Sequence, residues 1–421
     1  YKRQTLGCGL GQRMSTGSKG IARPTIEIEN TGERHTIDGV ELEFVYVLDT
    51  EAPVEIMVWI PQLKAFCTAE DMTHNMHNLQ TLRGAKVRNG LLWSKAVDTA
   101  IERYGNQVEV SFSTHHWPTW GNERIVDYWE AQRDMYRYLH DQTLHLANRG
   151  LTPDEIAEEM KLPASLSSQF NCRGYYGTLS HNVKAQYDLY FGWFNGNPAH
   201  LNPLPPSELG AKYVEAIGGA DKVLEVAKAS YAKGEYRWVA TLLDNLVFAE
   251  PDNMEARQLL ADTYTQLGYQ AESGPWRNFY LTGARDLFKK DVPYTSQLIN
   301  DGVLAQMDMG TLLDYCAIQL NGEKAAGKKA VININFTDTK EKVMLMLNNG
   351  VLNHRLDSQD EKADLTLEIE KMNFVKLFFG RTDLQTLLKT DKVKTTGNTQ
   401  AMDVICSAYE PADPNFKIVL P

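Results

Sequence analysis

Cysteine is scarce in this sequence, and long apolar runs are missing. The five cysteines (Cys8, Cys67, Cys172, Cys316 and Cys406) are scattered, odd in number and without a CxxC pair. This pattern provides neither a disulfide framework nor a thiolate zinc site. No window approaches the roughly eighteen uninterrupted apolar residues that a membrane-spanning helix needs, so we expect no transmembrane segment.

Positive charge is also in the minority. There are 43 Lys and Arg residues against 54 Asp and Glu residues, which gives a formal net charge of −11, and no dense basic cluster stands out. Binding to a nucleic-acid backbone requires a basic face, so no nucleic-acid partner is expected. An anionic substrate would need local arginine or metal charge.

The length and the apolar pattern predict several domains, because 421 residues are too many for one ordinary core. The first twenty residues begin with Tyr1 rather than Met and show no apolar signal core, so we expect a processed or incomplete chain.

Apolar alternation from Thr25 to about Thr114 predicts four strands, "TIEIEN", "VELEFVYVL", "VEIMVWIP" and "VEVSFST", with a helix, "LLWSKAVDTAIERYG", between the last two.

Helices are expected from Glu123 to about Leu287. The first ends at a glycine and Thr152 caps the next. Farther on, "GEYRWVATLLDNLVFAEPDNMEARQLLADTYTQLGY" predicts two helices about a "PDN" turn, as in tetratricopeptide hairpins. One such unit is too few for a solenoid, so packing or dimerisation is the better interpretation.

A small α+β domain is predicted from about Met309 to the end of the chain. It begins with a helix, "MGTLLDYCAIQL", continues with strands "KAVININFTD", "EKVMLMLNNG", "GVLNHRL" and "ADLTLEIE", and closes with a helix and a short tail. The "NNG" stretch is a favourable hairpin turn. The fold class is therefore multidomain, with α/β, α and α+β parts.

Two glutamates stand at the ends of predicted strands. Glu51 precedes one strand and Glu70 follows the next, so neighbouring loops can direct both carboxylates into one cavity. Carboxylates suit hard or borderline cations, and one glutamate can bridge two metals through its two oxygens. An isolated loop glutamate is nevertheless solvated more often than it is ligated. His115 and His116, where a later β-run stops, are natural metal donors but more often ordinary surface.

The stretch after Glu70 adds further polar groups. If residues 74–83 begin a helix, His74 and Asn78 share one side, and His77 lies near Glu70. Arg83 offers a planar donor fork for a tetrahedral oxyanion, and His77 can donate a proton to a leaving oxygen. Taken alone, the stretch fits a capped and solvated helix start equally well.

Six stretches together, in order along the chain, resemble the dizinc alkyl sulfatases of the metallo-β-lactamase superfamily. They are "TEAPVEI", "CTAEDMTHNMHNLQTLRGA", "THHWPTWGN", "YLHDQTLHLANRG", "RGYYGTLSHNVKA" and "LGYQAESGPWRNFYLTGA". The resemblance implies the C-terminal portion of a metallo-β-lactamase-type αββα catalytic domain in residues 1–122. It also implies an α-helical dimerisation domain in 123–290 and an α+β domain like sterol carrier protein 2 in 300–421.

The same resemblance implies a metal site. Glu51 stands where related enzymes place a ligand for one zinc, Glu70 is the bridging carboxylate, and His115 ligates the other zinc. Glu55 is the competing carboxylate in "TEAPVEI", and Glu51 is preferred because superfamily relatives place a histidine ligand at the equivalent turn. Two zinc ions are expected in a complete site.

The remaining site residues come from the resemblance as well. His77 is similar to the general acid and Arg83 to the main sulfate clamp. Asn78 and Tyr176 are expected as supporting donors to sulfate or to water at the zinc site, and His181 is a weaker candidate for the pocket rim.

One departure from the family is large. The HxHxDH motif, which supplies four metal-binding side chains in the family, is absent from these 421 residues. Glu51, Glu70 and His115 alone cannot hold two zinc ions in closed geometry. We therefore expect the site to be completed by an N-terminal part of the same protein. Among smaller departures, Asp49 replaces a usual Gly, and Asp71 stands where Asn is common, adding negative charge beside a zinc.

The expected activity is zinc-dependent hydrolysis of alkyl sulfate surfactants, such as dodecyl sulfate, to an alcohol and inorganic sulfate. A homodimer and, by analogy with bacterial relatives, a periplasmic or secreted location are expected. Two alternatives stay open: a non-catalytic module for lipid binding and dimerisation, and a dizinc hydrolase of another ester class. Whether attack occurs at sulfur or at carbon is also open.

Overall fold

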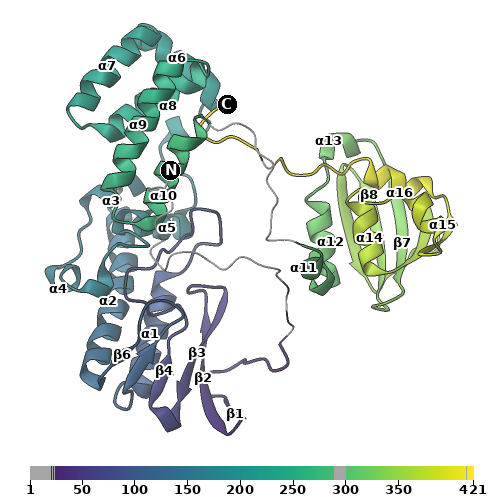
Figure 1. Cartoon of the computed structure of the whole chain (residues 1–421), viewed down its shortest axis with the longest axis horizontal. Coiled ribbons are helices and arrows are strands. Elements are labelled where there is room, and N and C mark those ends of the chain that lie inside the picture. Colours follow the sequence, from purple (N-terminus) through teal and green to yellow (C-terminus); the bar gives the residue numbers. More distant parts are fainter. Residues whose placement is uncertain (1–19, 21, 23, 289–299, 414) are drawn as a thin grey trace. The chain divides into compact units, whose positions relative to one another are not determined.

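The computed structural model describes residues 20, 22, 24–288, 300–413 and 415–421 (Figure 1). These residues fall into two compact units. One has residues 26–288 and 417–421, and the other has residues 300–413, 415 and 416 together with 20, 22, 24 and 25. The predicted combination of sheet-rich, helical and α+β parts is confirmed, and the first unit contains both the sheet-rich and the helical part. Within these ranges no helix is long and apolar enough to cross a membrane. The four described cysteines are free, and Cys8 lies outside the described residues.

The first unit contains a six-stranded sheet with its strands in sequence order. Neighbouring strands are antiparallel except β4 and β5, which are parallel and joined across helix α1. The strands are β1 (Arg34–Ile37), β2 (Val40–Leu48), β3 (Val54–Ile60), β4 (Ala65–Cys67), β5 (Val110–Phe112) and β6 (Thr119–Trp120).

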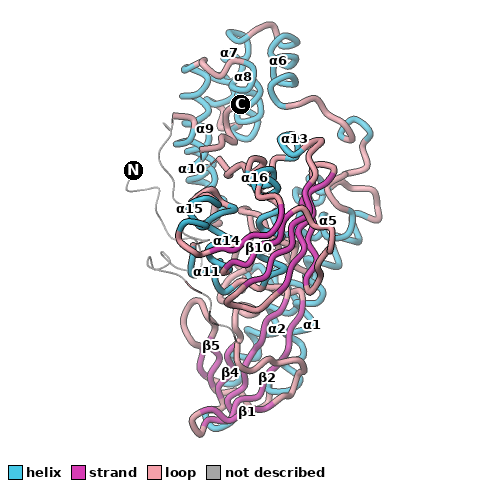
Figure 2. Tube along the Cα trace, turned by 90° about the vertical axis from the view of Figure 1, so that its right-hand side faces the viewer, coloured by secondary structure: helices cyan, strands magenta, loops and turns pink. Residues whose placement is uncertain are grey.

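Helices α1 (Gly90–Tyr104) and α2 (Asn122–Ala147) pack against each other and against one face of this sheet (Figures 1 and 2). In the register of β2 and β3, Val45 pairs with Met57, and both side chains are buried on the helix side. Trp93 of α1 is fully buried in the same core. The helix that the sequence predicts between the last two strands is therefore confirmed as α1, and its apolar face packs in this core.

The opposite face of the same strands is apolar but uncovered within the described chain. Leu48, Val54 and Ile56 are 49%, 54% and 37% exposed. Strands that are apolar on both faces are typical of sheets whose two faces are both covered. This face of the sheet is therefore suited to a further layer.

The rest of the first unit is helical. The capping box of Thr152 and Glu155 that begins α3 satisfies backbone donors at both positions. Asn253 caps α9 after the predicted "PDN" turn, which confirms the α8–α9 hairpin. These helices are α3 (Pro153–Glu159), α4 (Ala164–Ser167), α5 (Leu179–Phe191), α6 (Pro206–Ile217), α7 (Ala220–Ala232), α8 (Tyr236–Ala249), α9 (Met254–Gln270) and α10 (Gly274–Asp286).

The second unit is a five-stranded sheet, in the order β11-β10-β7-β8-β9, with helices packed around one core. Its "NNG" hairpin is confirmed, because Asn349 and Gly350 take φ of 52° and 77° between β8 and β9. The strands are β7 (Ala330–Phe336), β8 (Lys342–Asn348), β9 (Val351–Leu356), β10 (Leu365–Ile369) and β11 (Val393–Gly397). The helices are α11 (Asp301–Gln306), α12 (Met309–Ala317), α13 (Gly322–Ala325), α14 (Lys371–Phe378), α15 (Leu384–Lys389) and α16 (Gln400–Cys406).

Several strand predictions were wrong or missing. Residues 25–30 form no strand, because the backbone amides of Glu29 and Asn30 donate to the carboxylate of Glu33 at 2.8 and 2.5 Å instead of to a ladder. Strands β1, β6 and β11 were not predicted, and β4 was implied only as the strand that Glu70 follows. Each has only two to five residues, too few to show a two-residue period.

Candidate metal centre

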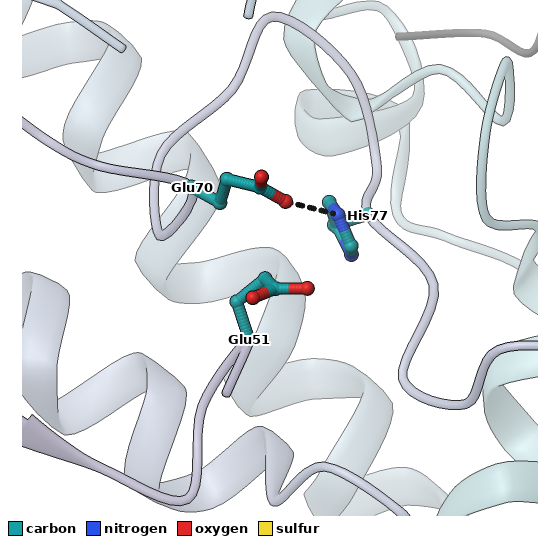
Figure 3. Close-up of side chains that lie close together, drawn as sticks. All are labelled: Glu51, Glu70 and His77. Atoms are coloured by element: carbon teal, nitrogen blue, oxygen red, sulfur yellow. Dashed lines mark ion pairs between the residues drawn. The ribbon is translucent and has the colours of Figure 1, made fainter. Parts of the chain in front are cut away.

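The sheet brings several site loops to one edge. The end of β2, the start of β3 and the ends of β4 and β5 all lie on the same side, because β2 and β3 are antiparallel, β3 and β4 are antiparallel, and β4 and β5 are parallel. Glu51 stands in the turn between β2 and β3, Glu70 follows β4, and His115 follows β5. Donor atoms of Glu51, Glu70 and His77 lie within 4.8 Å of one another, and Figure 3 shows the three side chains converging.

The Glu70 carboxylate lies between two histidines. Its Oε1 is 3.1 Å from Nε2 of His115, and its Oε2 is 3.4 Å from Nε2 of His77. The His77 ring, and after it His115, hold the pKa of Glu70 down at about 2, so this carboxylate is charged at neutral pH. Ala69, just before it, has a φ of +47°, and its carbonyl accepts from the Thr114 amide at 3.0 Å. Each glutamate oxygen therefore faces a different loop, as a bridging carboxylate requires.

His77 is 1% exposed, and both of its ring nitrogens face polar groups. Its Nδ1 lies 3.0 Å from the carbonyl oxygen of Asn78, which can only accept, and 3.3 Å from Nη1 of Arg88, which can only donate. The shorter contact favours a proton on Nδ1. Its Nε2 is buried without a hydrogen bond, although Glu70 Oε2 is within ion-pair range. With the proton on Nδ1, Nε2 and the Glu70 oxygen would both be acceptors, and either a metal cation or a proton taken up by Nε2 would satisfy both. Two carboxylates and an imidazole are a donor set that zinc accepts, so these residues fit the metal that the resemblance implies.

Burial also governs the protonation of His77. Burial lowers the pKa of the imidazole, and the positive charge of Arg88 lowers it further, whereas Glu70 and the Asn78 carbonyl raise it. The neutral ring is favoured as a result. Its Nδ1–H donates to a backbone carbonyl, which is the arrangement common among histidines that ligate metals.

Two further carboxyl groups lie behind Glu70. Glu55, the competing carboxylate of the sequence, accepts the Glu70 backbone amide through Oε1 at 3.0 Å. Asp71 is fully buried beside Thr50 and Glu55. Burial raises the pKa of both carboxyl groups, and their proximity raises that of Glu55 further. Glu55 thus supports the turn that carries Glu70.

Residues 74–83 form no helix. Several of their backbone groups bond to side chains from distant helices. Asn182 of α5 accepts from the Leu79 amide at 2.8 Å and donates to the His77 carbonyl at 2.9 Å, and Tyr136 of α2 accepts from the His77 amide at 3.2 Å. Gly177 lies so close that a Cβ there would stand 2.5 Å from the His77 carbonyl oxygen. These helices therefore shape the site loop.

Of the other predicted site residues, Tyr176 and Asn78 lie beside His77. The Tyr176 ring meets the His77 ring edge-on, with centroids 4.7 Å apart, and Asn78 is 3% exposed. Arg83 is exposed and makes no ion pair with any described residue. His181 lies 2.6 Å from the Gln80 carbonyl through Nε2 and accepts from Trp276 at 3.3 Å.

Arg88 is one residue of this site that the sequence did not indicate. It is 8% exposed, and its guanidinium contacts Glu51 and Asn78. It directly precedes Asn89, which caps α1, so the sequence pattern there announces a helix start and gives no sign of a buried arginine. Asn182 and Tyr136 were missed too, because they lie on amphipathic helices where polar residues are ordinary.

Fold and geometry together define a candidate divalent-metal site at the edge of a sheet, and comparisons with known proteins give its family. Residues 152–290 match the alkyl sulfatase dimerisation family model, and residues 297–421 match the alkyl sulfatase C-terminal family model. A linear primary-alkylsulfatase from Pseudomonas sp. is 45% identical over 418 residues, which are 99% of this chain and 62% of the relative. Another, from Pseudomonas sp. (strain ATCC 19151), is 30% identical over 422 residues, 98% of this chain and 79% of the relative.

A solved structure gives the same result. The stereoselective inverting sec-alkylsulfatase from Pseudomonas sp. matches with a TM-score of 0.95 at 40% identity, over 99% of this chain and 66% of that one. The chain belongs to the alkylsulfatase family. It spans 62% of the length of the first relative named above.

Proposed function

We propose that this chain is part of a zinc-dependent enzyme that hydrolyses alkyl sulfate esters, such as dodecyl sulfate, to an alcohol and inorganic sulfate. The observation that carries the proposal is the convergence of Glu51, Glu70 and His77 within 4.8 Å in a chain of the alkylsulfatase family. The charge of the Glu70 carboxylate at neutral pH supports a cation there. The same proposal includes a homodimer formed through the segment that matches the dimerisation family.

The complete site would hold two zinc ions, with Glu51, Glu70 and His115 among the ligands. The other donors would come from an HxHxDH-bearing part of the same protein. The exposed apolar face of Leu48, Val54 and Ile56 supports this arrangement, because a metallo-β-lactamase-type αββα fold would cover it with a second sheet. For residues 300–421 we propose a fold like sterol carrier protein 2, supported by the α+β core described above.

Residues of this chain would also bind the sulfate group. When bound, the metal pair would lower the pKa of a water molecule and offset the charge of sulfate. Arg83, exposed and without an ion pair among the described residues, would take sulfate oxygens with its donor fork. Asn78 turns its Oδ1 to Arg88, which leaves its amide NH2 to donate to the substrate, and Tyr176 contributes a phenol beside His77.

His77 has a separate part in the proposed reaction. If attack is at sulfur, the S–O bond breaks and His77 gives a proton from Nε2 to the leaving alkoxide. If attack is at carbon, the C–O bond breaks, sulfate leaves and the carbon inverts. The acid role requires Nε2 to be protonated first, which Glu70 favours at 3.4 Å while burial opposes it.

The test is zinc content and sulfate release by the full-length protein, with His115→Ala and His77→Ala compared. We expect about two zinc ions per protomer in the unchanged protein. His115→Ala is expected to lose zinc and activity, whereas His77→Ala keeps zinc and loses rate by about 100-fold or more. Zinc loss on His77→Ala would reassign that residue as a ligand. Alkyl-chain binding without zinc or product would favour the lipid-binding alternative, and faster turnover of phosphate esters or lactones would favour another ester class.

A further inference from the structure

Arg88 joins two loops of the site. Its Nε donates to the Glu51 carbonyl at 2.5 Å, and its Nη2 forms an ion pair with the Glu51 carboxylate. Its Nη1 donates to the Asn78 carbonyl at 2.9 Å and to Asn78 Oδ1 at 2.5 Å. A single buried guanidinium thus bonds the turn between β2 and β3 to the loop after β4.

These bonds leave Arg88 little capacity for substrate. An arginine has five N–H donors, and four N–H···O contacts of Arg88 go to Glu51 and Asn78. The side chain is 8% exposed, so a sulfate could reach it only by displacing those contacts. Arg88 therefore differs from Arg83, which is exposed. Its contacts suit a residue that acts through its neighbours.

The same bonds determine how three site residues present their atoms. The ion pair fixes one oxygen of Glu51, and the contact with Oδ1 fixes which end of the Asn78 amide faces inward. The Asn78 carbonyl, held by Arg88, also accepts the Nδ1–H of His77 at 3.0 Å. That contact turns Nε2 of His77 toward Glu70.

We propose that Arg88 is a positioning residue for the metal centre: it holds Glu51, Asn78 and His77 in the orientation in which a metal and a sulfate ester bind. The expected effect on catalysis rests on the proposed function. Coulomb repulsion alone would give the opposite result, since a cation beside Glu51 weakens the binding of another cation. Positioning and repulsion therefore predict changes of opposite sign when the guanidinium is removed.

The experiment compares Arg88→Met with the unchanged full-length protein by zinc titration against a chelator, by steady-state kinetics on dodecyl sulfate, and by hydrogen–deuterium exchange. We expect zinc affinity to fall by about 10- to 100-fold, as is usual when a group that orients metal ligands is lost. We expect kcat to fall more than KM rises, and amide exchange to increase in residues 49–55 and 74–82. Equal or tighter zinc binding, or unchanged exchange in both loops, would overturn the proposal.

Two further variants control for folding. Arg103→Met removes a guanidinium that contacts the buried carboxylate of Glu43, away from the metal centre, so it should lower stability and leave zinc affinity unchanged. Arg88→Lys keeps the charge without the planar fork and should also weaken zinc binding even if Arg88→Met does not fold. Wild-type zinc affinity in Arg88→Lys would contradict the proposal. If the unchanged protein takes up no zinc, the proposed function is wrong. The difference in amide exchange of the two loops between Arg88→Met and the unchanged protein would still decide whether Arg88 positions them.

Discussion

The β7–β9 segment of the second unit and the loop of residues 68–89 in the first unit are organised in contrasting ways. Along the β7–β8 and β8–β9 hairpins, residues pair with partners nearby in sequence, such as Asn348 with Val351. In the loop, several partners are distant: Asn182 is 103 residues from Leu79, and Gln186 is 98 residues from Arg88, whose carbonyl it contacts. Pairing between neighbouring strands leaves an alternating apolar pattern in the sequence. Hydrogen bonds to distant helices leave no pattern in the sequence of the loop itself.

The largest expected effect in testing this contrast comes from Asn182→Leu. The change leaves the Leu79 amide and the His77 carbonyl buried without their partner. Each unsatisfied buried group costs about 1–3 kcal/mol, so we expect the free energy of unfolding of the first unit to fall by about 2–5 kcal/mol. Urea unfolding followed by tryptophan fluorescence measures it.

The matched control is Asn148→Leu, at the exposed end of α2. A surface change of this kind should stay within about 0.5 kcal/mol of the unchanged protein. If Asn182→Leu were equally mild, the loop would be held by something other than this side chain, and the contrast with the hairpin would fail.

The sequence predicted those parts of the fold whose information is local. The strands β2, β3 and β7 to β10, the α8–α9 hairpin and the "NNG" turn all follow from short-range periodicity or turn chemistry. The candidate metal centre was predicted in part, because Glu51, Glu70 and His77 belong to one recognisable stretch and its neighbour. Arg88 was not predicted, because no local pattern shows its contacts with Glu51 and Asn78. The irregular path of residues 74–83 was not predicted, because it depends on helices that lie far along the chain.

The second prediction concerns the hairpin itself. Gly350→Ala places a Cβ at a φ of 77° and 3.0 Å from the Gly322 carbonyl oxygen. The left-handed conformation costs an L-residue about 1–2 kcal/mol, so the second unit should lose about that much stability while zinc content and activity remain unchanged. Differential scanning calorimetry of the full-length protein resolves the two units if each unfolds separately. Gly380→Ala, at a positive φ with open space, is a control for the conformational cost alone. Equal losses in both would show that the contact with Gly322 adds nothing.

The smallest expected effect concerns pH and a carboxylate inside a predicted strand. Glu43 of β2 is buried, and its carboxylate accepts from Arg103 and Tyr104 of α1 at 2.7 and 2.8 Å and from Arg34 at 2.7 Å. Burial raises the pKa of Glu43, but these hydrogen bonds outweigh burial and hold the pKa below its ordinary value. A carboxyl whose pKa is lowered by folding stabilises the fold above its unfolded pKa, and this contribution is lost as the pH falls through the folded pKa.

Glu43→Gln should therefore destabilise the first unit more at pH 6 than at pH 3. The difference should be about 1 kcal/mol or less, since Arg34 and Arg103 are partly exposed and solvent screens the pairs. Urea unfolding at the two pH values measures it, with the exposed Glu109→Gln as control. An equal loss at both pH values would mean that the charge of Glu43 contributes nothing. A greater loss at pH 6 would show that even a strand predicted from local alternation contains one position whose stability depends on residues 60 positions away.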